Sequence, residues 1–150
     1  MIQRIQSLYL LLGAVLMAVV VFGLGAYWNL PLTSAGWLVP AFRVLGSLTV
    51  LVGVAAIFLY KDRSKPGKLL PGLRRQRKIV VGVQVLTVLA MAALFAVLYL
   101  ARRFQVSTDP GGMAVLALPV AAYVCFYLAR LGIDRDIREL VKADQFRLRD

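Results

Sequence analysis

Four long stretches without Asp, Glu or Lys constrain the fold of this 150-residue chain more than any other feature. Arg43 and Arg130 are the only cations inside them, and both lie near an end. About 20 helical residues span roughly 30 Å, the hydrocarbon thickness of a typical bilayer. Each stretch is therefore long enough to cross a membrane. The expected spans are about 8–28, 41–60, 79–101 and 112–132.

Composition supports a membrane protein rather than a soluble one. The chain is 61% hydrophobic and its mean hydropathy is +0.79, whereas soluble domains are usually nearer half apolar. The apolar stretches do not alternate with polar residues, and backbone polar groups must be paired within hydrocarbon, so helices are favoured over barrel strands. The connections are short, so consecutive helices should be antiparallel. We therefore predict an all-α membrane protein, a single domain of four antiparallel transmembrane helices.

The distribution of Lys and Arg predicts the orientation. Eight lie in 61–78, one is Arg4, and six lie from Arg130 onward, which places fifteen on one side of the membrane. The other side has only three: Arg43, Arg102 and Arg103. Loops rich in Lys and Arg stay in the cytoplasm. We expect a multi-pass membrane protein with cytoplasmic N- and C-termini.

The tail 133–150 is expected to contain a short amphipathic cytoplasmic helix. Ile133, Ile137, Leu140 and Val141 recur at the spacing of one helix face. On the polar side, the spacing of Asp134 and Arg138, and of Glu139 and Lys142, would allow ion pairs. The tail could be a docking face for a partner or lipid surface, or simply an extension of the fourth span, which is the interpretation favoured here.

Within the connection 61–78, the stretch KPGKLLPGLRRQRK at 65–78 resembles a nucleic-acid-binding arm in composition. Two Pro-Gly pairs, Pro66-Gly67 and Pro71-Gly72, instead predict a flexible turn with no domain to position it on DNA. We expect no nucleic-acid partner. The loop should set the topology and attract anionic lipid headgroups. The candidate lipid contacts are Lys61, Arg63, Lys65, Lys68, Arg74, Arg75, Arg77 and Lys78.

The chain lacks the usual side chains of an active site. Histidine is absent, Cys125 is the only cysteine, and all seven acids lie outside the four spans. No phosphate-binding Gly-rich motif occurs. We therefore expect no catalytic residue, no cofactor and no metal site, and the chain is not expected to be an enzyme. Cys125 is expected to be a small core residue.

Polar and small residues within the spans have two interpretations. Ser47, Gln84 and Thr87 could line a solute path, but such residues more commonly form interhelical hydrogen bonds. Gly46 and Gly53 lie seven residues apart and return to nearly the same helix face, which favours close helix packing. Pro119 should kink the fourth span.

Three segments resemble a family of small bacterial membrane proteins with four predicted spans, catalogued only as a domain of unknown function. They are MIQRIQSLYLLL at 1–12, IFLYKDR at 57–63 and DIRELVKADQFRLR at 136–149. Here Gln145 and Phe146 separate Asp144 from Arg147, where the family reads nearer to an uninterrupted DRLR. The resemblance covers the chain in length and layout. It implies the fold and a location in the bacterial inner (cytoplasmic) membrane, without implying an activity.

Two functional hypotheses follow from these patterns. The first is a non-enzymatic accessory, assembly or scaffold component that acts through other membrane proteins, self-association or lipid. The alternative is a small oligomeric carrier or channel with a path lined by Ser47, Gln84 and Thr87.

Overall fold

A computed structural model describes the backbone of residues 2–28, 35–58, 69–100 and 110–147, and side chains within these ranges at 5–26, 35–58, 71–100 and 110–142. All the regular structure in these residues is helical. The helices are α1 (Ile2–Ala18), the π-helical turn η1 (Val19–Gly23), α2 (Gly25–Trp28), α3 (Leu38–Phe58), α4 (Leu69–Leu100) and α5 (Pro110–Arg147).

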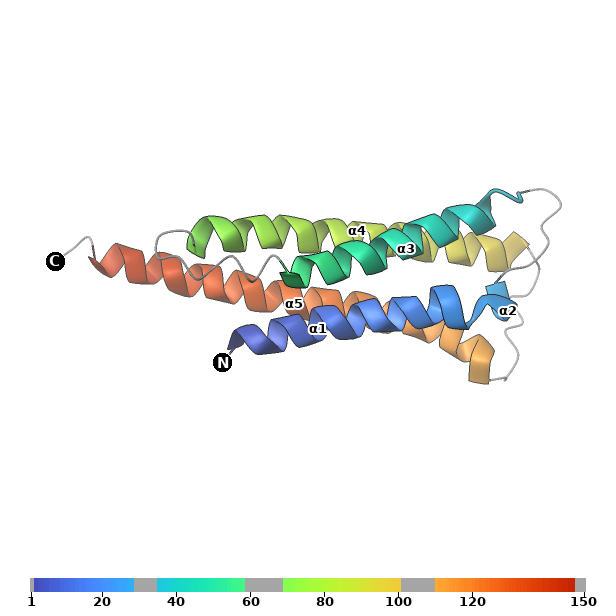
Figure 1. The fold of residues 1–150 in the computed structure, drawn as a ribbon, viewed down its shortest axis with the longest axis horizontal. Helices are drawn as coiled ribbons and strands as arrows, with labels where there is room; N and C mark the ends of the chain where they lie inside the picture. The colour runs from blue at the N-terminus through green and yellow to red at the C-terminus, as the bar shows by residue number, and fades with distance from the viewer. Residues whose placement is uncertain (1, 29–34, 59–68, 101–109, 148–150) are drawn as a thin grey trace.

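The four long helices lie side by side and successive ones run in opposite directions (Figure 1). Helices α1 and α4 each pack against both α3 and α5, so the four helices form a closed ring. Both termini lie at the same end of the bundle (Figure 1). We call this end, where α4 begins and α5 ends, the basic end.

Within the described residues, four helices are long and apolar enough to cross a membrane: Ile5–Gly23, Leu38–Phe58, Pro71–Leu100 and Pro110–Lys142. Many large apolar side chains point outward along them, including Leu8, Phe22, Leu51 and Val85. Such an apolar exterior is costly in water and is the surface that lipid requires. The chain is thus an all-helical, multi-pass membrane protein.

The helix α4 begins inside the segment expected to be a loop. The prediction of a turn over 61–78 is wrong from Leu69 onward, because α4 starts there. Pro71 lies in the first turn, where the missing N–H has no helical partner in any case, so the Pro-Gly pair does not prevent the helix.

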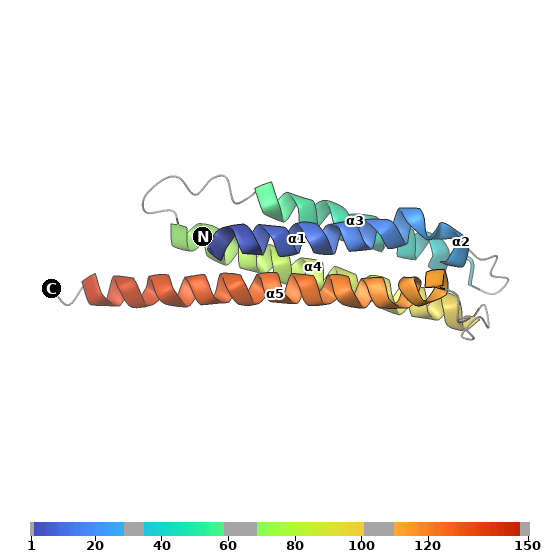
Figure 2. The ribbon, with the colours of Figure 1, turned by 90° about the horizontal axis from the view of Figure 1, so that it is seen from below.

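The expected C-terminal helix is a direct continuation of the fourth span. α5 runs for 38 residues, about 57 Å at 1.5 Å per residue and nearly twice the hydrocarbon thickness. It extends past the ends of α1 and α4 (Figure 2). Pro119 lies inside α5 without interrupting it. A separate tail helix is therefore not formed within the described residues.

Close packing in the middle of the bundle centres on Phe126. Its side chain is fully buried, and a Cβ added to Gly13 of α1 would lie 2.7 Å from its Cε1 atom. Gly53 of α3 faces the same ring at 3.5 Å. Gly46 approaches Val21 of η1 so closely that an added Cβ would lie 2.5 Å from Cγ2. The seven-residue spacing of Gly46 and Gly53 thus does mark a packing face.

Candidate functional site

The first turns of α4 have one inward and one charged face. Leu73, Gln76 and Val80 are buried, and Gln76 donates a hydrogen bond from Nε2 to the carbonyl oxygen of Ala56 at 3.4 Å. The exposed residues between them are Arg74, Arg75, Arg77 and Lys78. A rigid helix therefore holds these four cations on one side of the basic end, rather than a flexible loop.

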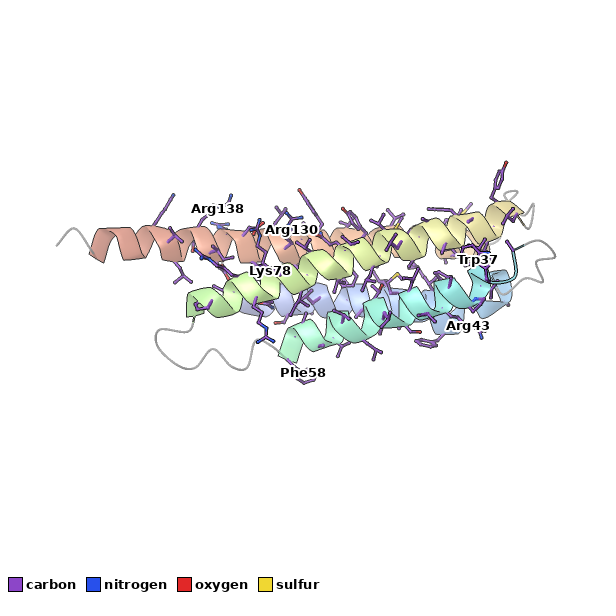
Figure 3. The ribbon with its side chains drawn as sticks, turned by 90° about the horizontal axis from the view of Figure 1, so that it is seen from above. Trp37, Arg43, Phe58, Lys78, Arg130 and Arg138 are labelled. Carbon is purple, nitrogen blue, oxygen red and sulfur yellow. The ribbon has the colours of Figure 1, made fainter. Side chains whose placement is uncertain are left out.

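A groove of about 460 Å³ lies between this start of α4 and the distal part of α5. We call it the basic groove. Four of its lining side chains are cations and one is a carboxylate; the lining residues are Arg74, Arg77, Lys78, Asp134, Ile137 and Arg138. In Figure 3, Lys78, Arg130 and Arg138 lie toward the basic end, and Trp37 and Arg43 lie toward the other.

The carboxylate of Asp134 belongs to a polar chain that joins α4 and α5. Arg77 Nε lies 2.6 Å from Asp134 Oδ1, and Arg130 Nε lies 3.7 Å from Oδ2. Arg130 also donates from Nη1 to Gln84 Oε1 at 3.3 Å. We call Arg77, Asp134, Arg130 and Gln84 the polar chain. Gln84 is 7 residues beyond Arg77, so the polar chain extends about 10 Å along α4 toward the bundle centre.

A second polar contact joins α1 to α5. Gln6 donates from Nε2 to Asp136 Oδ2 at 2.8 Å, and both side chains are buried. Gly132 makes room for this contact, because a Cβ there would lie 2.8 Å from Gln6 Cγ. The two residues are 130 positions apart, so no local pattern could have predicted that they meet.

Ion pairing on α5 differs from the expected pattern. The predicted Asp134–Arg138 and Glu139–Lys142 pairs are wrong, because Asp134 binds Arg77 and Arg130 while Glu139 accepts from Arg135 Nε at 3.3 Å. Asp134 instead lies between Arg77 of α4 and Arg130, one turn earlier on its own helix. Arg138 is thereby left to line the basic groove.

The structure places the predicted lipid contacts in two groups. Arg74, Arg77 and Lys78 line the basic groove, and Arg75 lines an adjoining hollow of about 350 Å³ with Pro71, Arg74 and Lys78. The other four, Lys61, Arg63, Lys65 and Lys68, lie outside the described residues. Arg138 is a groove residue that the sequence analysis missed.

The residues proposed for a solute path have partners inside the protein or lie apart from the groove. Thr87 is fully buried and donates from Oγ1 to the carbonyl oxygen of Val83 on its own helix at 2.7 Å. Gln84 accepts from Arg130, although its Nε2 has no partner among the described residues. Ser47 is half-buried on α3. Gln84 thus bonds a neighbouring helix, as is common for polar residues in a bundle, whereas Thr87 bonds its own helix.

The other side chains in the described residues include few groups that could react or bind a metal. Cys125 is buried in α5 as a free thiol. Within the described ranges no group of three His, Cys, Asp or Glu side chains could hold a metal ion. What the basic end offers is therefore concentrated positive charge in a shaped groove.

Comparison with known families identifies the family of the chain. Residues 2–145 match the model described as Domain of unknown function (DUF4293). The chain belongs to the DUF4293 family. The match confirms the resemblance to a family catalogued as a domain of unknown function. No curated protein and no solved structure matches this DUF4293 chain.

Proposed function

We propose that this DUF4293 protein is a non-enzymatic component of a bacterial inner membrane, an accessory, assembly or scaffold subunit. It would act through contacts with other membrane proteins, through self-association and through anionic lipid. The single observation that carries this proposal is the division of the polar groups: those inside the bundle bond the helices to one another, while the cations of the basic groove face outward.

The orientation in this proposal follows from charge. In the sequence, fifteen Lys and Arg residues fall in the segments expected on one side of the membrane and only three in those expected on the other, and cytoplasmic loops carry the excess of cations. With the basic end inside the cell, α5 would extend beyond the headgroups into the cytoplasm. Its exposed polar side chains there, such as Arg135 and Glu139, would be open to a partner.

Lipid association is the second element of the proposal. A juxtamembrane cation contributes about 1 kcal/mol of attraction to an anionic leaflet. Arg74, Arg75, Arg77 and Lys78 all lie on the exposed side of the first turns of α4, immediately before the apolar run from Ile79. This position is the expected depth of lipid phosphates.

Cross-linking in native membranes tests the proposed role. A photoreactive amino acid at exposed positions on α1, α3 and α5, such as Leu8, Leu51 and Leu131, should yield reproducible adducts with the same membrane proteins or with a second copy. Buried Leu94 provides the control position, which should yield none. Purification in mild detergent as a monomer with no adducts from any exposed position would contradict an accessory or scaffold role.

A further inference from the structure

We propose that the basic groove is a binding site for a terminal phosphate group, a phosphomonoester, carried by a lipid headgroup or by a small molecule. This inference deepens the lipid contact of the proposed function and rests on it. It replaces a diffuse attraction between cations and an anionic surface with a defined site on two helices.

The charges of the groove are unbalanced. Arg74, Arg77, Lys78 and Arg138 face a single carboxylate, that of Asp134. Asp134 is already shared between Arg77 and Arg130. No carboxylate in the described part of the chain pairs with Arg74, Lys78 or Arg138. Four cations against one acid leave an excess of three positive charges for an anionic ligand to neutralise.

The donors suit a phosphate with free oxygens. Arginine presents a planar fork that binds phosphate oxygens in pairs, and lysine adds a compact charge. A phosphomonoester carries close to two negative charges at neutral pH and three terminal oxygens. A phosphodiester has one charge and two such oxygens. The excess charge and the three forks of Arg74, Arg77 and Arg138 therefore favour the monoester.

The groove is held in shape by the helices around it. Asp134 contacts Arg77 through Nε, which fixes the orientation of that guanidinium group. Ile137 supplies an apolar wall and packs against the buried core. Leu73 and Gln76 anchor the same turns of α4 from the inside. The cations therefore converge on one hollow instead of spreading along a mobile loop.

A charge-matched pair of variants tests the site. Arg138→Gln removes a groove cation, whereas Arg135→Gln removes an exposed cation three residues earlier that pairs with Glu139 outside the groove. We would measure the apparent Kd of the full-length protein for phosphatidic acid by native mass spectrometry in detergent. Arg138→Gln should weaken binding about tenfold, as expected for one charge-assisted bond, and Arg135→Gln no more than about twofold.

A second groove variant and a panel of ligands complete the test. Lys78→Gln should behave like Arg138→Gln, and phosphatidylglycerol, a phosphodiester, should bind more weakly than phosphatidic acid. Displacement of the lipid by glycerol 3-phosphate would show that the site takes the phosphate group itself, and binding of the lipid alone would assign it to a headgroup. Equal losses in Arg138→Gln and Arg135→Gln, or no preference for the monoester, would overturn the site.

These results are independent of the cross-linking experiment. Failure of the phosphate site would leave the membrane partners found by cross-linking in place. Absence of partners, with the Arg138 and Arg135 variants still separated, would remove the scaffold role and keep the site. The thermal unfolding of each variant in detergent should match that of the unmodified protein.

Discussion

The middle of the bundle and its basic end are held together by different interactions. In the middle, Phe126 fills the space left by Gly13 and Gly53, and Val21 fills the space beside Gly46. At the basic end, the Gln6–Asp136 contact joins α1 to α5 and the polar chain joins α4 to α5.

This difference follows from the two solvents. Lipid tails are as apolar as the side chains, so helices within hydrocarbon gain little from burying apolar surface and depend on close packing. At the headgroup level water competes for polar groups, and buried pairs such as Gln6–Asp136 must be complete to be stable. The middle should therefore be sensitive to volume, and the basic end to the loss of one partner and to salt.

The largest loss of stability is expected from removing the Phe126 side chain at the centre of the packed region. Phe126→Ala should lower the free energy of unfolding by about 3 kcal/mol, because a cavity remains between α1, α3 and α5. Phe58→Ala is the control: its side chain is 71% exposed and points outward (Figure 3), so the change should stay within about 0.5 kcal/mol. Denaturation by SDS in mixed micelles measures both. Equal losses would contradict the packing account.

Adding volume at the same place should have the next largest effect. Gly13→Ala places a methyl group against the Phe126 ring and should cost about 2 kcal/mol in the same assay. At Gly82 an added Cβ meets nothing within 4 Å, so Gly82→Ala should be neutral or slightly stabilising. If the two glycines tolerate alanine equally, α1 and α5 do not approach as closely as described.

At the basic end, removing one partner of a buried pair should cost more than removing both. Asp136→Leu leaves the Gln6 amide buried without its acceptor and should cost about 1.5 kcal/mol. The double variant Gln6→Leu/Asp136→Leu should recover part of this loss. A double-mutant cycle of unfolding free energies measures the coupling, and strictly additive losses would show that the contact contributes nothing.

The smallest effect is expected from the exposed ion pairs. The side chains of Arg77 and Asp134 are 48% and 22% exposed, so Asp134→Asn should cost about 0.5 kcal/mol at low salt and less at high salt. Glu139→Gln, which affects the more exposed Arg135–Glu139 pair, should cost still less. The free energy of unfolding of both variants would be measured at two ionic strengths. A loss of stability that does not depend on salt would contradict an electrostatic origin.

The sequence predicts the architecture well because span length and hydropathy are local properties. The four expected spans correspond to the four long helices. The third helix is expected to begin only at 79 because Pro71-Gly72 suggests a turn, whereas α4 begins at Leu69. Leu73 and Val80, seven residues apart and both buried, were a helical signal that the charges between them obscured.

The candidate site could be predicted only in part. The cluster of cations before Ile79 is visible in the sequence, but the contribution of Arg138 depends on how α4 and α5 pack. Pairing of Asp134 with Arg77 rather than Arg138 likewise depends on the distance between helices. Interactions between residues far apart in sequence require the tertiary structure.

The central claim is that the basic end of the bundle faces the cytoplasm. The accessibility of single cysteines at the two ends of the bundle tests it most directly. In a Cys125→Ala background, Trp37→Cys probes the end opposite the basic end and Glu139→Cys probes the basic end; both native side chains are exposed. A membrane-impermeant maleimide applied to spheroplasts should label Trp37→Cys, and should label Glu139→Cys only after lysis. Labelling of Glu139→Cys in intact spheroplasts would contradict the account.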